Sequence, residues 1–201
     1  MDREEAKAAL QMLRKVVAQA KDDTALQNWG MVWMCSAVSN GGGFFATHLL
    51  LRAGDEDPWS YVGVWGVVFA LNALFLVTLK GRGRGAASFI ERQTWAIWNI
   101  FIVAMCLAAV VNYIIGLTTL FLPSVAAIIA MMTFAFMGAI MGRWWLLPAA
   151  AWGVLALVMA ATPGVQFALF AVLWAATQGG AGYLLHRARR AARQRAAGAS
   201  A

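Results

Sequence analysis

Charged residues are so sparse along this chain that they divide it into long uncharged stretches. These stretches cover residues 24–51, 58–79, 93–142 and 144–186. A helix needs about 20 residues to cross a hydrocarbon core of about 30 Å, so the first two stretches have room for one membrane span each and the last two for two spans each. The longer stretches divide where glycine and proline interrupt a helix, at Gly116–Pro123 and at Thr162–Gly164.

The pattern predicts an all-α integral membrane protein with six transmembrane helices preceded by a cytoplasmic amphipathic helix. The expected spans are about 29–51, 59–79, 94–114, 120–141, 145–161 and 165–185. The chain then has three segments, which are the amphipathic helix over 1–27, the six-helix bundle over 28–186 and a basic cytoplasmic tail over 187–201. Strands are not expected, because the apolar runs are continuous and lack the alternation of membrane β-strands.

Composition and charge agree with a membrane protein and predict its orientation. Of the 201 residues, 62% are hydrophobic and 12% are charged, whereas about a quarter of the residues are charged in soluble proteins. Positively charged loops stay on the cytoplasmic side during insertion. With six spans, every Lys and Arg except Arg52 falls on one side, and Arg52 shares its loop with Asp55, Glu56 and Asp57. We therefore expect both termini in the cytoplasm.

The N-terminal arm is expected to form a helix at the cytoplasmic membrane surface. Over residues 2–23 apolar side chains recur at helical spacing, and Lys7, Arg14 and Lys21 follow one another at intervals of seven. These three basic residues therefore share one flank of the helix. The helix either lies on the inner leaflet, where anionic lipid attracts it, or docks to a cytosolic protein or to a second copy of the chain.

The arginine-rich run after His186 is a second basic segment at this surface. It includes Arg189 and Arg190 and could continue the last helix into the cytosol. Its ordinary role is to anchor the last span. Nucleic-acid binding is not expected, because no aromatic residue or recognition element accompanies the arginines.

The first span carries small and polar residues where a membrane helix is normally apolar. Helical spacing places them on one face, which consists of Ser36, Ser39, Asn40, Gly43 and Thr47. We interpret it as a packing face, matched on the second span by Gly66, Ala70 and Ala73. The alternative is an unwound segment at Gly41–Gly43 that lines a solute site. Asn40 and Asn72 lie at comparable depth on antiparallel spans, so their side chains could form a hydrogen bond.

Tryptophan marks most of the expected span ends, where indole favours the headgroup level. Six of the ten tryptophans fall there, namely Trp29, Trp59, Trp95, Trp98, Trp144 and Trp145. The other four lie deeper, where they would pack against other helices, lipid or a bound aromatic molecule.

Residues that carry chemistry are scarce inside the expected spans. No Asp, Glu, Lys or Arg falls within a span, whereas proton relays and retinal Schiff bases require such groups. The HExxH, GxSxG and P-loop patterns are absent from the sequence. We therefore predict no catalytic residue and no metal site.

His48 is the candidate for a cofactor ligand. It lies near the outer end of the first span, close to Phe44, Phe45 and Leu51. One imidazole is enough to ligate the magnesium of a chlorophyll-type pigment. The alternative is an interfacial histidine hydrogen-bonded to loop carbonyls or water, which is the commoner situation. No other cofactor is expected.

The segment EEAKAALQMLRKVV leads into NWGMVW, and six spans and an arginine-rich tail follow. In this layout the chain resembles a broad group of uncharacterised bacterial six-span inner-membrane proteins with an N-terminal amphipathic helix. Some members are encoded beside small winged-helix regulators. The resemblance implies a bacterial inner-membrane location and a regulatory or accessory role, and it carries over no site residue.

Together these observations favour a non-catalytic membrane protein that acts by helix–helix contact. It would be an accessory subunit of a larger membrane complex or the membrane partner of a cytosolic protein. Its expected partners are the lipid bilayer and either other membrane subunits or a second copy. Two alternatives stay open, which are a carrier or channel for a neutral or amphiphilic small solute and a pigment-binding subunit of a photosynthetic complex that uses His48.

Overall fold

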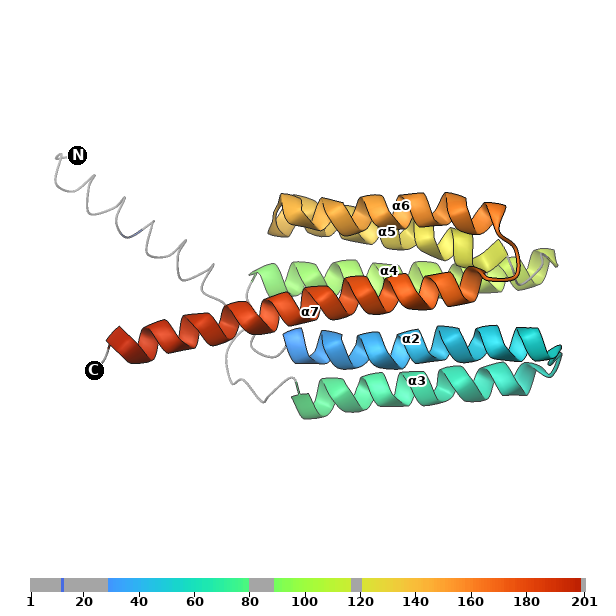
Figure 1. Ribbon diagram of the computed structural model, residues 1–201, viewed down its shortest axis with the longest axis horizontal. Coiled ribbons are helices and arrows are strands. Elements are labelled where there is room, and N and C mark those ends of the chain that lie inside the picture. The colour runs from blue at the N-terminus through green and yellow to red at the C-terminus, as the bar shows by residue number, and fades with distance from the viewer. Residues whose placement is uncertain (1–11, 13–28, 80–88, 117–120, 200–201) are drawn as a thin grey trace.

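The computed structural model describes residues 12, 29–79, 89–116 and 121–199, and over these residues it contains helices and no strand. The helices are α2 (Trp29–Ala53), α3 (Pro58–Leu79), α4 (Phe89–Ile115), α5 (Phe121–Met141), the short 3-10 helix η1 (Arg143–Trp145), α6 (Leu146–Ala161) and α7 (Gln166–Ala199). In Figure 1 the long helices lie side by side. The amphipathic helix expected over 1–27, with Lys7, Arg14 and Lys21, lies outside the described residues apart from Met12.

Each of the six expected spans coincides with a helix. The breaks between α4 and α5 and between α6 and α7 fall at Gly116 and Gly164, whose φ angles of +70° and +95° suit glycine. Among the described residues, five helices are long and apolar enough to cross a membrane, with the segments Pro58–Leu79, Arg92–Ile115, Leu122–Met141, Arg143–Ala161 and Gln166–Ala188. The 25 residues of α2 are long enough, but α2 is not among the five. Asn40, His48 and several serines and glycines lower its hydropathy.

An acidic turn joins α2 to α3. Gly54 follows the end of α2 with a φ of +71°. Asp57 begins α3 by accepting a hydrogen bond from the Trp59 amide at 3.1 Å, and Pro58 follows in the first helical position, where a missing N–H does no harm. A hydrogen bond from the Ser60 side chain and another from the Asp57 amide lower the pKa of Asp55. The turn therefore holds negative charge at this end of the bundle.

Successive long helices run in opposite directions (Figure 1), so α2 begins and α7 ends at the same end of the bundle. That end carries the exposed side chains of Arg92, Arg143, Arg187 and Arg190. Arg52 and the acidic turn lie at the opposite end.

The backbones of α2 and α7 touch. A Cβ added at Gly30 would lie 2.6 Å from the carbonyl oxygen of Gly182 and 2.7 Å from the backbone nitrogen of His186. A Cβ added at Gly182 would lie 2.7 Å from the carbonyl oxygen of Gly30 and 2.9 Å from the backbone nitrogen of Met34. Real Cβ atoms do not come this close to backbone, so glycine at both positions permits the contact.

The other helices pack around this pair. α3 packs on α2, while α4 and α6 pack on α5. Aromatic side chains fill the centre. α3 is the least covered helix, since Val68 is the one buried residue within Pro58–Leu79. The outer surfaces of α3 and α4 are largely apolar, as lipid requires.

Alanine at Gly30 or Gly182 is expected to destabilise the bundle, because the added methyl group meets backbone atoms that move only if α2 and α7 separate. Overpacking of this kind costs about 1–3 kcal/mol. The matched controls are Gly42→Ala and Gly180→Ala on the same two helices, where an added Cβ meets nothing within 4 Å. There alanine gains up to about 1 kcal/mol of helix propensity. Thermal unfolding in detergent compares all four variants, and equal melting temperatures for Gly30→Ala and Gly42→Ala would contradict the backbone contact.

Candidate functional site: an amide pair and a tryptophan core

Asn40 of α2 and Asn72 of α3 form a pair of hydrogen-bonded amides. Asn72 Nδ2 donates to Asn40 Oδ1 at 3.0 Å and to the carbonyl oxygen of Val68 at 2.9 Å. Both amide side chains are half-buried. Asn40 lies 11 residues into α2, about 16 Å along the helix, so the pair lies near mid-depth in the bundle. The hydrogen bond that the sequence suggested is confirmed.

The small-residue face of α2 lies inside the bundle, with Ser36, Ser39, Gly43 and Thr47 all buried. Ser39 Oγ donates to the carbonyl oxygen of Ser36 at 3.3 Å, and Thr47 Oγ1 donates to that of Gly43 at 2.9 Å. Both hydroxyl groups are therefore satisfied within their own helix. Gly43 faces α3, where an added Cβ would lie 2.6 Å from Cγ2 of Val68.

The prediction of which α3 residues pack on this face of α2 is wrong. Gly66 and Ala70 are exposed, and a Cβ added at Gly66 would meet nothing within 4 Å. α3 instead turns Val68 and Asn72 toward α2. The reason is steric, because Gly43 leaves a hollow that the branched side chain of Val68 fills, whereas glycine on both helices would leave a void.

α2 is a continuous helix through Gly41–Gly43, so the structure does not contain the unwound segment considered as an alternative. Gly41 packs against α7, where an added Cβ would lie 3.4 Å from the carbonyl oxygen of Ala171 and from Cβ of Ala175. Sequence reasoning missed this partner. A signal was present in α7, where small residues recur every three or four positions at Ala171, Ala175, Gly179 and Gly182.

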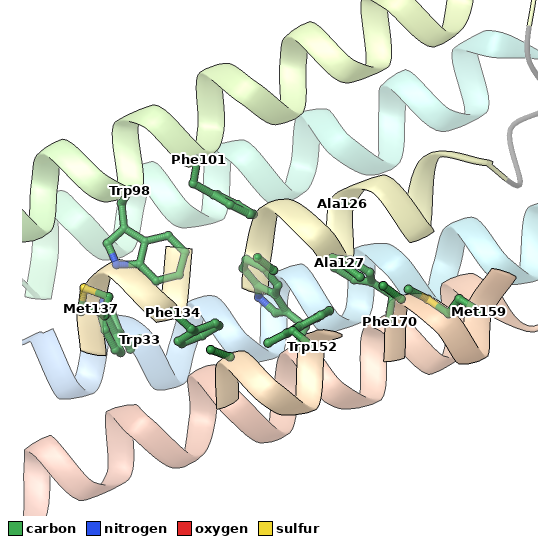
Figure 2. Packing of buried hydrophobic residues seen from close by; sticks show 14 of the residues in the cluster. Trp33, Trp98, Phe101, Ala126, Ala127, Phe134, Met137, Trp152, Met159 and Phe170 are labelled. Carbon is green, nitrogen blue, oxygen red and sulfur yellow. The ribbon is translucent and has the colours of Figure 1, made fainter. Parts of the chain in front are cut away.

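Aromatic rings from α2, α4, α5, α6 and α7 fill the centre of the bundle. The ring of Trp174 stacks on that of Phe101 with centroids 5.5 Å apart and on that of Phe170 at 5.8 Å. It meets Trp98 and Trp152 edge-on, at 6.2 and 5.9 Å. Figure 2 shows Trp98, Phe101, Trp152 and Phe170 pointing into the space between their helices. We refer to seven residues as the tryptophan core, namely Trp29, Trp33, Trp98, Phe101, Trp152, Phe170 and Trp174.

Trp29 and Trp98 are buried in this core, at 5% and 8% exposed, although the sequence predicted both at the headgroup level. Trp33 contacts both of them, with ring centroids at 6.1 and 5.6 Å. Trp59 and Trp144, by contrast, are 74% and 82% exposed, as expected for indoles at a span end. An indole near a helix end suits either environment, and the rotation of its helix decides between them.

Several buried polar atoms have no hydrogen-bond partner within the described residues. They are Nε1 of Trp29, Trp98 and Trp174, Oγ1 of Thr94, and Oε1 of Gln166 and Gln178.

Four of these atoms belong to Thr94 and Trp98 of α4 and to Trp174 and Gln178 of α7. Thr94 precedes Trp98 by one turn on α4, and Gln178 follows Trp174 by one turn on α7. Because α4 and α7 run in opposite directions and Trp98 contacts Trp174, Thr94 and Gln178 lie on the same side of that contact. We refer to these four residues as the polar layer. Water molecules or small neutral solutes with both a donor and an acceptor would satisfy these groups.

The other predicted residues lie apart from the polar layer. His48 is half-buried, with its ring centroid 6.1 Å from that of Phe45. The described part of the chain contains no group of three or more His, Cys, Asp or Glu that could hold a metal ion. Cys35 and Cys106 are free thiols. Arg190 is exposed on α7, whereas the side chain of Arg189 lies outside the described set.

No protein-family model, no curated protein and no solved structure matches this chain.

Replacing the two amides measures their hydrogen bond. Asn40→Ala and Asn72→Ala are each expected to lower stability, and the double variant to lower it by less than the sum, because the shared bond is lost once. Interhelical bonds of this kind contribute about 0.6 kcal/mol on average. A double-mutant cycle in mixed micelles gives the coupling, and a cycle of Asn40 with Asn99 of α4 is the control. Additive effects in the first cycle would show that the hydrogen bond contributes nothing.

Substitutions at the neighbouring positions Thr177 and Gln178 of α7 are expected to change the stability of the bundle in opposite directions. Thr177→Val should cost about 1–3 kcal/mol, because Thr177 Oγ1 accepts the hydrogen bond of the fully buried Trp152 indole at 3.3 Å. Gln178→Leu should raise stability, because it removes a buried acceptor that has no protein partner. Thermal unfolding in detergent compares the two variants. Destabilisation by Gln178→Leu equal to that of Thr177→Val would contradict this expectation and indicate a bound molecule in the polar layer.

Proposed function

We propose that helices α2 to α7 are six transmembrane spans of a bacterial inner-membrane protein whose termini both lie in the cytoplasm. In this proposal the protein acts without catalysis, as an accessory component that binds a cytosolic protein. The amphipathic helix over 1–27 then lies on the same side as the C-terminal tail.

The polarity of α2 is compatible with a sixth span. Its 25 residues correspond to about 38 Å, more than the hydrocarbon thickness of about 30 Å. Its polar side chains Ser36, Ser39 and Thr47 are buried within the bundle. Lipid therefore does not meet them, and their low hydropathy does not oppose insertion.

The distribution of charge supports the orientation. Exposed Arg92, Arg143, Arg187 and Arg190 lie at one end of the bundle, and the acidic turn with Arg52 lies at the other. Positive loops are retained in the cytoplasm, so the arginine-rich end is the cytoplasmic one.

The observation that carries the proposal is the extension of α7. This helix has 34 residues, about 51 Å in length. Figure 1 shows α7 continuing past the ends of the neighbouring helices. The part from His186 to Ala199 alone is about 21 Å long, whereas the headgroup layer on one side is about 5–8 Å thick.

A positive helix that extends beyond the headgroups suits a soluble partner. Between His186 and the C-terminus the sequence has five arginines and no acidic residue. Attraction to anionic lipid falls off within a Debye length of about 8–10 Å, so it reaches the base of the extension and not its far half. An acidic surface on a cytosolic protein would complement the charge along the whole length.

Removing three of the five positive charges of the extension tests the proposal. The variant carries Arg187→Gln, Arg190→Gln and Arg193→Gln, and the matched control carries Lys at the same three positions. We expect the unmodified protein and the Lys control to co-purify with one cytosolic protein at fixed stoichiometry in native mass measurements. The Gln variant should bind that protein about tenfold more weakly, because exposed ion pairs contribute about 0.5 kcal/mol each.

The melting temperature should be the same for all three proteins, since the changes lie outside the bundle. A monomer without any co-purifying protein, or equal binding by the Gln and Lys variants, would count against the proposal.

A further inference from the structure

A row of exposed residues runs along the outer side of α4. The row consists of Ala96, Asn99, Val103, Cys106, Val110 and Tyr113, and all six are exposed. They are separated alternately by three and four residues, which is the spacing of the contact positions in a left-handed coiled coil. The opposite side of α4 carries the buried residues Thr94, Trp98 and Phe101. The row therefore faces away from the bundle along most of the helix.

Asn99 is the residue in this row whose side chain is unfavourable in contact with lipid. It lies within the candidate span Arg92–Ile115, seven residues or about 10 Å from the end at Arg92. Its exposed neighbours include Ile100, Ile102 and Val103. Its amide makes no hydrogen bond within the described part of the chain. An amide that faces hydrocarbon leaves two donors and an acceptor unsatisfied, so an interhelical partner stabilises it.

We propose that two copies of this chain pair through α4, with Asn99 of each copy hydrogen-bonded to Asn99 of the other across a two-fold axis along the membrane normal. The amide is complementary to itself, because it carries both a donor and an acceptor. All copies insert in one orientation, so the two α4 helices run parallel and equivalent residues meet at equal depth. The inference rests on the proposed function only in that α4 spans the membrane, and it names one partner of the bundle.

The side chains of the row allow the close approach that this bond needs. Ala96, Val103 and Cys106 are small or of medium size and flank Asn99 on successive turns. Membrane helices pair most closely where such residues meet. The bulkier Ile100 and Leu107 are exposed on the neighbouring flank, where they would contact lipid at the edge of the dimer.

Cys106 gives a direct readout of this geometry. It follows Asn99 by seven residues, so it lies two turns further along the same row, and its thiol is free and exposed. In the proposed dimer the two Cys106 thiols face each other across the axis. Copper-phenanthroline with dioxygen removes two electrons and two protons from such a pair and leaves a disulfide.

The first measurement is oxidative cross-linking in native membranes of a Cys35→Ser variant, which keeps Cys106 as its one thiol. We expect a reducible band of twice the monomer mass. The control replaces Cys35 and Cys106 by Ser and carries Val77→Cys on α3, where Val77 is 82% exposed but lies on a different helix. Absence of the Cys106 band, or an equal band from the Val77→Cys control, would overturn the proposal.

The second measurement tests Asn99 itself. Asn99→Leu is expected to weaken dimerisation about 3- to 30-fold in native mass titrations, the range that interhelical hydrogen bonds produce, while Asn99→Gln keeps a donor and an acceptor and retains the dimer. An undiminished Cys106 band in Asn99→Leu would refute the role of the amide. Binding of a different membrane protein at α4 would refute the proposal that a second copy of the chain is the partner. Retained binding of the cytosolic partner by a monomer would leave the proposed function intact while this inference fails.

Discussion

The backbone contact between α2 and α7 is the constraint on which the rest of the bundle depends. In a bilayer no hydrophobic effect draws helices together, so close packing has to supply the attraction. Gly30 and Gly182 permit backbone to meet backbone, and Gly41 opposite Ala171 continues the contact along both helices. Because α2 and α7 are the first and last long helices that the structure describes, their contact closes the bundle and holds the intervening helices against one core.

The tryptophan core is the counterpart of this contact. Where α2 and α7 meet through small residues, no space is left for side chains, whereas α4, α5 and α6 lie further from them and large rings fill the distance. Trp33 links α2 to α4 through Trp98, and Trp174 links α7 to α4 through Phe101. The many glycines and the many tryptophans of this sequence therefore serve one packing arrangement.

The helices and one polar contact between them could be predicted from the sequence. Which helices pack against each other could not. Helix limits followed from the rarity of charge and from glycines such as Gly116 and Gly164. The pairing of Asn40 with Asn72 followed from counting depth along two helices joined by a short turn. The contact of α2 with α7 could not be predicted in this way, because well over a hundred residues separate Gly30 from Gly182. No local pattern says which distant helix packs against a small-residue face.

The polar layer and the buried position of Trp98 were unpredictable for a related reason. Both depend on how far each helix is rotated about its own axis, and a rotation of 100° per residue separates an inward from an outward position. Sequence spacing says which residues share a face, but the aromatic contacts across the core decide which face turns inward. Indole is compatible with headgroups and with other indoles. The identity of Trp98 alone therefore does not predict whether its side chain faces the headgroups or the interior of the bundle.

The same contacts determine why Asn99 points outward. It follows Trp98 directly, so bringing its amide into the bundle requires α4 to rotate by about 100°. That rotation would carry Trp98 and Phe101, each 8% exposed, out into lipid and break their ring contacts with Trp33 and Trp174. Aromatic pairs of this kind contribute about 0.5–1.5 kcal/mol each beyond their buried area, and one interhelical amide bond contributes about 0.6 kcal/mol. The loss exceeds what a single internal hydrogen bond would return, so the bundle keeps its rings inside and leaves the amide on its outer surface.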